Sequence, residues 1–289
     1  MVPMNNDNGE ILIAVAHPSE EEAVRRAAAY SGCRCMIIVT GVGGAAMSWA
    51  LQKRFTLGML PGRRLPGTEP GKHLPGTEPG KHLPGTEPGK HLPGTEPGKH
   101  LPGTEPGMKE RTASPAGNHA ATTLPSLVIG AGIAGSYAES IPPGTVVTTL
   151  SDCFADMGVD DNGHFIPLFG AGLADANTPP FSGGRIVCSG RWFDIAAGIM
   201  PAVRGATVNM ASGSQAAIDR IRKAWDPEIE TMEGAWLAYT CAMSGIPWVS
   251  VRAVSNMVEP RNLKNWNIPL ALQNLQEKMI QLLELIAKS

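Results

Sequence analysis

A repeat of nine residues interrupts this chain and decides which parts of it can form a core. The unit LPGTEPGKH runs four times without change over residues 65–100, and a fifth copy breaks off at Gly107. Its many prolines and glycines and single leucine cannot bury enough apolar surface to offset the cost of ordering the chain. The repeat also matches none of the known solenoid families. We therefore expect residues 58–122 to form a flexible insertion in one domain spanning residues 1–289.

The histidines of the repeat raise the question of a metal site. His73, His82, His91 and His100 recur once per unit. In an extended polyproline-like chain, successive histidines would lie about 28 Å apart, too far to share one ion unless the chain folded back. We expect neither a metal nor a cofactor.

Composition indicates a soluble enzyme. With 43% hydrophobic residues, the chain can bury a substantial core, and a net charge of −2 gives no electrostatic reason to bind nucleic acid or an anionic membrane. No apolar run approaches the roughly 20 residues of a membrane span, and residues 1–10 do not resemble a signal peptide. The five cysteines form no CxxC pair and are typical of buried thiols. We expect a cytoplasmic protein.

Without the insertion, strand and helix patterns alternate. Buried-type strands are predicted at residues 11–16, 35–40, 127–129, 145–150 and 206–208, and helices at residues 45–55, 214–225 and 269–288. This order is typical of an α/β protein. We expect a three-layer α/β/α fold around a mixed, mostly parallel sheet.

One motif suggests a dinucleotide-binding fold. Residues 130–135 read GAGIAG after a predicted strand, and Asp152 lies near the distance expected of a ribose-binding acid. A dinucleotide-binding unit also needs a crossover helix before its next strand. Only residues 136–141 are available ahead of Pro142, so the spacing disfavours this interpretation.

Two polar residues stand in apolar surroundings near the C-terminus. Glu233 precedes an apolar helical pattern, and such an acid must find donors, for which the hydroxyls of a ribose are suitable. Asn256 follows the strand-like run at residues 248–254, and its carboxamide can donate to O6 of a 6-oxopurine. The alternatives are an acid paired with a nearby arginine and a turn-forming asparagine.

Six short stretches then carry a resemblance. They are GVGG at residues 41–44, GIAGS at 132–136, FADMG at 154–158, TVN at 207–209, MEG at 232–234 and RAVSN at 252–256. In this order they resemble the nucleoside phosphorylase/nucleosidase superfamily, over roughly residues 11–55 and 124–289. Within it the chain looks most like the futalosine hydrolases, which release hypoxanthine from futalosine in menaquinone biosynthesis. The related methylthioadenosine nucleosidases carry Asp at the position of Asn256.

The resemblance implies hydrolysis of an N-glycosidic bond through an oxocarbenium-like transition state. A glutamate just after the first strand would activate water; Glu20 matches best, and Glu21 and Glu22 remain possible. Glu233 would bind the ribose and Asn256 the base. The substrate-binding residues would further include the glycine-rich stretch and a methionine under the sugar: Gly132, Ile133, Ala134, Gly135, Ser136 and Met232. The expected partners are a nucleoside substrate and further copies of the chain in a homo-oligomer.

Futalosine also carries an aryl carboxylate on its 5′ side. Arg261 could pair with that carboxylate while Trp266 stacks nearby, although a loop arginine and a tryptophan capping the last helix are plain structural alternatives. The rival functions are a methylthioadenosine-type nucleosidase, a nucleoside-binding module and a purine nucleoside phosphorylase. Residues 41–46 and 130–136 lack the arginines that a phosphate site of this family would use.

Overall fold

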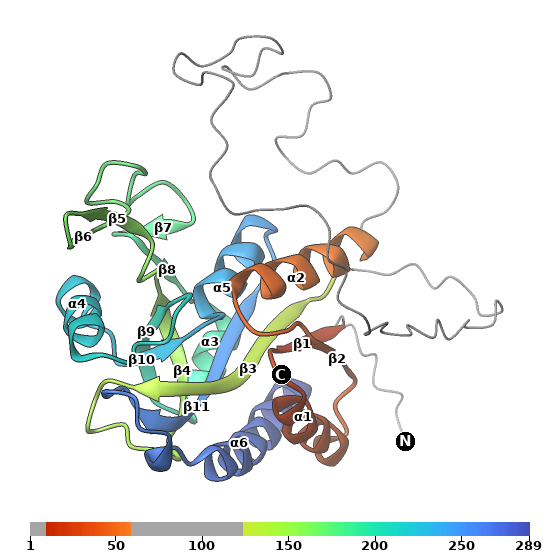
Figure 1. Ribbon diagram of the computed structural model, residues 1–289. Helices are drawn as coiled ribbons and strands as arrows, with labels where there is room; N and C mark the ends of the chain where they lie inside the picture. Colours follow the sequence, from red (N-terminus) through yellow and green to blue (C-terminus); the bar gives the residue numbers. More distant parts are fainter. Residues whose placement is uncertain (1–9, 59–123) are drawn as a thin grey trace, which may run out of the picture. The chain divides into compact units, whose positions relative to one another are not determined.

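The computed structural model describes residues 10–58 and 124–289, which belong to one compact unit (Figure 1). Apart from Gly58, the insertion predicted at residues 58–122 lies outside the described residues, as do the histidines of its repeat. Within the described ranges, no helix is long and apolar enough to cross a membrane. The elements are β1 Ile11–Val15, α1 Pro18–Ser31, β2 Cys35–Val39, α2 Gly44–Gly58, β3 Leu127–Ser136, β4 Val146–Asp152, β5 Gly158–Asp161, β6 His164–Pro167, β7 Phe181–Ser182, β8 Arg185–Val187, α3 Arg191–Ala197, β9 Ala202–Thr207, α4 Gln215–Trp225, β10 Ile229–Thr231, α5 Gly234–Met243, β11 Trp248–Met257, the 3₁₀ turn η1 Leu263–Asn265 and α6 Ile268–Lys288.

The central sheet is mixed and partly closes on itself. Strand β3 pairs in parallel with β1 and β11 and antiparallel with β10. Because β11 also pairs with β4, β4 with β9, and β9 with β10, these five strands form a closed ring. Strand β2 extends the sheet beyond β1, and β8 and β7 extend it beyond β4. The predicted α/β class with a mixed sheet is confirmed.

Helices cover both faces of the sheet, as the alternation along β1 requires (Figure 1). Ile11, Ile13 and Val15 face one core, which contains buried residues of α1, α3 and α6. Leu12 and Ala14 face the other core, together with residues of α2 and α5. The predicted three-layer arrangement is therefore confirmed.

The glycine-rich motif lies inside a strand. The prediction of a short strand at residues 127–129 followed by a glycine loop is wrong, because β3 continues through residue 136. A Cβ at Gly130 would lie 2.5 Å from Leu237 Cδ1 of α5, so the glycine here allows close packing and is not needed for a turn. The dinucleotide-binding alternative is excluded as well, because the glycines lie in a strand and no helix separates β3 from β4.

Strand β11 is also longer than predicted. Asn256, expected directly after the strand, lies within β11 at a register shift between Val254 and Asn256. Such a β-bulge re-aims the side chains that follow it. Asn256 therefore pairs with Gly135 of β3, and it is not a turn residue.

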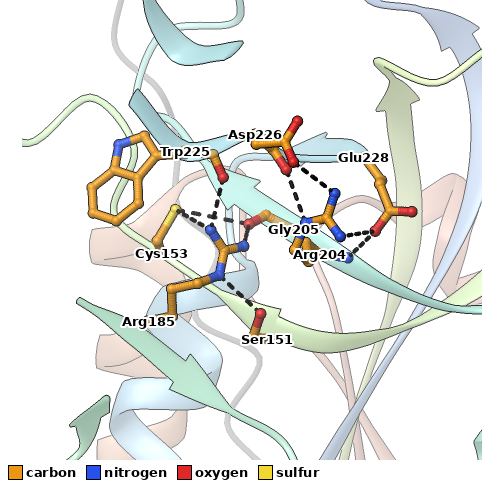
Figure 2. A network of polar contacts seen from close by, with 8 residues as sticks. All are labelled: Ser151, Cys153, Arg185, Arg204, Gly205, Trp225, Asp226 and Glu228. Atoms are coloured by element: carbon orange, nitrogen blue, oxygen red, sulfur yellow. Dashed lines mark hydrogen bonds and ion pairs between the residues drawn. The ribbon is translucent and has the colours of Figure 1, made fainter. Parts of the chain in front are cut away.

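A polar network secures the connection from β9 through α4 to β10 (Figure 2). Arg185 donates to Ser151 Oγ of β4 at 2.9 Å, to the carbonyl of Gly205 in β9 at 2.6 Å and to the carbonyl of Trp225 at the end of α4 at 3.3 Å. Arg204 donates to the backbone and side chain of Asp226. The network fixes where β10 begins, and β10 leads directly into the candidate site.

Candidate functional site

A cavity of about 360 Å³ opens where β1, β10 and β11 end near the C-terminal part of β3. This volume is within the range of small-molecule sites. Nine of the eleven predicted site residues line it: Glu20, Ile133, Ala134, Gly135, Met232, Glu233, Asn256, Arg261 and Trp266. The other two do not. Gly132 lies behind the wall, and the hydroxyl of Ser136 is buried and donates to the carbonyl of Ala138.

Glu20 turns back from the first turn of α1 over the end of β1. Its Oε2 accepts the backbone N–H groups of Ala16 at 2.9 Å and His17 at 3.0 Å, in a capping box with His17, and its Oε1 accepts that of Ile133 at 3.0 Å. Glu21 and Glu22 instead pair along the helix with Arg25 and Arg26. Of the three candidate acids, Glu20 faces the cavity.

A buried arginine that the sequence analysis missed stands beside Glu20. Arg252 on β11 is only 1% exposed; its Nε donates to Ser250 Oγ at 3.1 Å, and its Nη2 has no hydrogen-bond partner among the described residues. A Cβ built on Gly132 would lie 2.7 Å from Glu20 Oε1 and 2.8 Å from Arg252 Nη1. Gly132 therefore makes the room in which the acid and the cation approach each other.

Glu233 lies in the turn between β10 and α5. Its Oε1 accepts the backbone N–H of Gly43, from the loop before α2, at 2.8 Å. Burial raises the pKa of this carboxyl, while the charge of Arg252 and the Gly43 hydrogen bond oppose the rise. Oε1 of Glu233 thus has a backbone partner, and the carboxyl lies near the charge of Arg252 without forming an ion pair with it.

The turn that carries Glu233 is held from beneath by hydroxyls and a buried acid. Thr207 Oγ1 accepts the backbone N–H of Ala235 at 2.7 Å and donates to Asp152 Oδ1 at 2.9 Å, and Thr231 Oγ1 accepts that of Gly234 at 3.1 Å. Burial raises the pKa of Asp152 to about 6, with the Thr207 hydrogen bond opposing the rise. These bonds satisfy the first N–H groups of α5 and position the carboxylate of Glu233.

The amide of Asn256 has a defined orientation. Its Nδ2 donates to the carbonyl of Met257 at 2.9 Å, and its Oδ1 accepts the hydroxyl of Ser255 at 2.8 Å. One N–H and one lone pair remain available for a ligand. The side chain lies over Gly135, where a Cβ would come within 3.3 Å of Nδ2.

The segment after β11 forms another part of the cavity wall. The backbone N–H of Arg261 donates to the carbonyl of Gly213 at 3.1 Å, which ties this segment to the loop after β9. The exposed guanidinium of Arg261 forms no ion pair with any described residue, and the half-buried Trp266 lines the same wall. The loop therefore presents a cation and an aromatic ring to the cavity.

Three charged residues in or beside the cavity wall were not predicted: Arg252, Glu230 and Glu259. Arg252 could have been recognised, because a lone arginine inside an otherwise apolar strand pattern needs an anionic partner or a ligand. Glu230, on the short strand β10, lines the cavity as well, and nothing in its local sequence marks it. Among the described residues, no group of acids, cysteines and histidines could hold a metal ion.

The spacing along β3 separates two kinds of chemistry. Arg252 pairs with Gly132 and Asn256 pairs with Gly135, so the acid–cation pair and the amide lie about 10 Å apart along the strand. A nucleoside, with water attacking its sugar and the far edge of its base held, spans a distance of this order. The cavity offers a proton acceptor, a buried cation and an oriented amide in one line.

Comparison with known proteins finds matches in both sequence and structure. A sequence profile described as "Phosphorylase superfamily" matches residues 109–288. The chain is 32% identical over 154 residues to a futalosine hydrolase of Streptomyces coelicolor and 33% identical over 156 residues to one of Acidothermus cellulolyticus. Each match covers 52% of this chain and spans 62% of the relative's length.

Solved structures share the fold at low sequence identity. The native structure of the futalosine hydrolase of Helicobacter pylori strain 26695 matches with a TM-score of 0.63 and 10% identity, covering 99% of this chain and 100% of that one. A 5′-methylthioadenosine/S-adenosylhomocysteine nucleosidase of Neisseria meningitidis, solved with methylthio-immucillin-A, matches with a TM-score of 0.61 and 15% identity, covering 96% of this chain and 99% of that one.

Proposed function

Because this chain belongs to the phosphorylase superfamily, we propose that it hydrolyses the N-glycosidic bond of futalosine and releases hypoxanthine, a step of menaquinone biosynthesis. One observation carries the proposal: Glu20, Glu233 and Asn256, which come from three distant parts of the chain, line one cavity of nucleoside size. The sequence similarity to two futalosine hydrolases supports the choice of substrate.

In the proposed reaction, water attacks C1′ of the ribose. Glu20 accepts a proton from this water with a free lone pair of its carboxylate, and Arg252 Nη2, which has no partner among the described residues, holds the water oxygen. The water oxygen bonds to C1′ as the bond from C1′ to the base breaks, and the bonding electrons leave with the base. The base then takes up a proton, and Glu20 returns its own to solvent.

The ribose is held by Glu233 in this proposal. An ionised carboxylate accepts about four hydrogen bonds, so Glu233 can accept them from vicinal hydroxyls besides the backbone N–H of Gly43. Burial opposes ionisation of Glu233, and the nearby charge of Arg252 supports it. The carboxylates of Glu233 and Glu20 favour an oxocarbenium-like sugar, since carboxylates at the sugar stabilise developing positive charge.

The base is held by Asn256. Its free N–H donates to O6 of hypoxanthine, and its free Oδ1 lone pair accepts from a protonated N7. A 6-aminopurine would place an N–H donor against the amide N–H. This mismatch disfavours adenosine-type substrates such as methylthioadenosine.

The charges at the cavity also favour water over phosphate as the nucleophile. Arg252 is the cation nearest the expected point of attack, and it lies between Glu20 and Glu233, which would repel a phosphate anion. Arg261 lines the cavity from another wall, and there we propose that it pairs with the aryl carboxylate of futalosine while Trp266 packs on the ring.

The test is release of free base by the purified chain. Futalosine, aminofutalosine, methylthioadenosine and inosine are offered in parallel, with and without phosphate, and hypoxanthine and adenine are quantified. We expect hypoxanthine from futalosine at the same rate in both buffers. Adenine release would overturn the assignment of Asn256 while leaving a nucleosidase. Release that needs phosphate would indicate a phosphorylase, and no release would indicate a binding module.

A second comparison tests the tail pocket. Arg261→Ala should raise the KM for futalosine about tenfold or more, since a charged hydrogen bond is lost, and should leave turnover of inosine, which has no aryl carboxylate, unchanged. Equal kinetics of Arg261→Ala and the unmodified chain on futalosine would remove Arg261 from the site.

A further inference from the structure

The indole ring of Trp236 packs against the loop that binds Glu233. Trp236 lies in the first turn of α5, three residues after Glu233. A Cβ built on Gly44 would overlap the five-membered ring of the indole at Nε1, Cδ1 and Cε2. The ring therefore lies directly on the backbone where the loop after β2 enters α2, and only a glycine leaves room for it there.

The loop at residues 41–44 has little of its own to fix its shape. Three of its four residues are glycines, and Gly41 and Gly43 have φ angles of 89° and 93°, in the left-handed region that favours glycine. Val42, the remaining residue, is 58% exposed. The backbone N–H of Gly43 nevertheless lies 2.8 Å from Glu233 Oε1. Side chains outside the loop therefore have to hold this donor in place.

A second contact fixes the indole. Its ring centroid lies 4.7 Å from that of Phe154, at an interplanar angle of 63°, which is an edge-to-face contact. Its Nε1 is buried and has no hydrogen-bond partner among the described residues. Because an unpaired buried N–H opposes burial, packing on Phe154 and Gly44 holds the ring, and no hydrogen bond does.

Two helices carry the two partners of the Gly43–Glu233 hydrogen bond. Glu233 is the N-cap residue of α5, and its carbonyl accepts the backbone N–H of Leu237 at 3.0 Å. The carbonyl of Gly43 accepts the backbone N–H of Met47 in α2 at 3.1 Å, so this loop residue is tied to α2. The helices lie side by side (Figure 1). Trp236 adds a contact between them directly beside the Gly43–Glu233 bond.

We propose that Trp236 is a positioning residue that keeps the backbone N–H of Gly43 on the carboxylate of Glu233. The proposal rests on the proposed function for the role of Glu233 in binding the ribose. Trp236 does not line the cavity, so it acts through Glu233 and not on the substrate. Without the indole the loop can leave Glu233, and the carboxylate then loses a donor that stabilises its charged form.

The ionisation of Glu233 reports on this contact. Burial raises the pKa of this carboxyl, and the Gly43 hydrogen bond is one of the effects that lower it. Loss of that bond should therefore raise the pKa further. The charged groups of the surrounding elements are Arg252 on β11, Glu20 on α1, Glu230 on β10 and Asp152 on β4, and all of them are kept in the variants below.

An NMR titration of glutamate carboxyl carbons tests Trp236 without requiring turnover. The glutamates are isotopically labelled, and the signal of Glu233 is identified by its absence in Glu233→Gln. The unmodified chain is compared with Trp236→Leu and with a matched control, Tyr239→Leu. Tyr239 lies on the same helix, is also half-buried and packs on the same Phe154, with ring centroids 6.1 Å apart. If Trp236 only filled the core, both variants would behave alike.

We expect the proton-binding constant of Glu233 to rise about tenfold in Trp236→Leu, as for one lost hydrogen bond to a charged group. In Tyr239→Leu it should stay within about twofold of the unmodified chain. A constant in Trp236→Leu within about twofold of the unmodified chain would overturn the proposal, as would an equal rise in both variants.

Two further variants cover the case in which Trp236→Leu does not fold. Trp236→Phe keeps a ring beside Phe154 but lacks the five-membered ring that covers Gly44, so it should give a smaller rise in the same direction. Gly44→Ala forces the indole and the loop apart from the other partner and should give a rise of about tenfold. Unchanged proton binding by Glu233 in these variants would overturn the proposal.

Kinetics separate this inference from the proposed function. In Trp236→Leu, kcat/KM for futalosine should fall about tenfold more at acidic than at alkaline pH, because the ribose is held by ionised Glu233. If proton binding by Glu233 depends on Trp236 but futalosine is not cleaved, the proposed function fails and this inference stands. If futalosine is cleaved and proton binding does not depend on Trp236, the reverse holds.

Discussion

Two regions of this molecule place arginines among acids and carbonyl groups, and they differ in what remains unsatisfied. In the network of Figure 2, Arg185 and Arg204 donate hydrogen bonds to carbonyl, hydroxyl and carboxylate groups of the protein. Beside the cavity, Arg252 keeps a buried Nη2 that has no hydrogen-bond partner among the described residues. The first arrangement holds the fold together, and the second retains hydrogen-bonding capacity for a ligand. An unused hydrogen-bond donor, more than the presence of charge, distinguishes the candidate site from the network of Figure 2.

The largest difference between the regions is expected at Glu20. Glu20→Gln removes the proton acceptor and keeps the shape of the side chain, so kcat for futalosine should fall about 10²- to 10⁴-fold while substrate still binds. The measurement is steady-state kinetics with calorimetric binding. Glu21→Gln, whose partner is Arg25 on the helix surface, is the control and should keep full activity. Retained turnover in Glu20→Gln would mean that Glu20 is not the proton acceptor of the candidate site.

A methyl group at Gly132 tests whether the acid and the cation act as a pair. Gly132→Ala would bring Cβ to 2.7 Å from Glu20 Oε1 and 2.8 Å from Arg252 Nη1, so both must shift. We expect a loss of about 10²-fold in kcat, the usual cost of misplacing reacting groups by about 1 Å.

The control for Gly132 is Gly170→Ala, where the nearest atom to a new Cβ lies 3.4 Å away and little change is expected. Kinetics and melting curves of both variants are compared. Normal kcat in a folded Gly132→Ala would show that the approach of Glu20 and Arg252 is incidental.

Asn256 should control which base leaves. Asn256→Asp replaces the amide N–H donor by an acceptor, which suits N6 of adenine and opposes O6 of hypoxanthine. The ratio of kcat/KM for futalosine over aminofutalosine should therefore fall by about 10²-fold. Competition assays with both substrates in one vessel measure the ratio directly, and an unchanged ratio would place the base elsewhere.

Asp152 is a buried acid that does not line the cavity. Its Oδ2 has no hydrogen-bond partner among the described residues. Burial raises its pKa from 3.8 to about 6, so the native state keeps its proton to higher pH than the unfolded chain does. Stability from this group is therefore full below about pH 4 and is lost as the pH rises to about 6, by about 3 kcal/mol at most.

The test for Asp152 is chemical unfolding across that pH range. The free energy of unfolding of Asp152→Asn, relative to the unmodified chain, should rise between pH 4 and 7. Asp161→Asn on the surface should show no such trend. A flat difference for Asp152→Asn would mean that the buried acid costs the fold nothing.

The smallest effects belong to the network of Figure 2. Arg185→Ala removes one hydrogen bond from each of the Gly205 and Trp225 carbonyls and should lower the free energy of unfolding by about 1–3 kcal/mol. Arg204→Ala breaks a pair with Asp226, whose side chain is 92% exposed, and should cost under about 1 kcal/mol. Activity per folded molecule should persist in both variants, and a loss of kcat would show that the network also serves the site.

Much of this organisation follows from local sequence. The amphipathic pattern of α6 and the apolar alternation of β1 identify their elements without reference to the rest of the chain. Glu233 and Asn256 stand out because each is polar in an apolar stretch. The extent of β3 could not be predicted, since glycines are typical of loops and only the packing of Leu237 and Glu20 against them explains a strand.

Other features depend on contacts between distant segments. Glu230 lines the cavity because β10 pairs with Gly135. This long-range pairing cannot be predicted from the local sequence of a strand of three residues. The bulge that aims Asn256 likewise arises from the register of β11 on β3. Local patterns indicate candidate site residues, and tertiary pairing decides which of them line one cavity.

The most direct test of the account is a crystal structure of Glu20→Gln with intact futalosine, because this variant should bind substrate without cleaving it. We expect the ribose hydroxyls to donate hydrogen bonds to Glu233 and C1′ to face residue 20 and Arg252. The edge of the base should lie across Gly135 against Asn256. A nucleoside bound outside this cavity, or one whose base lies away from Asn256, would contradict it.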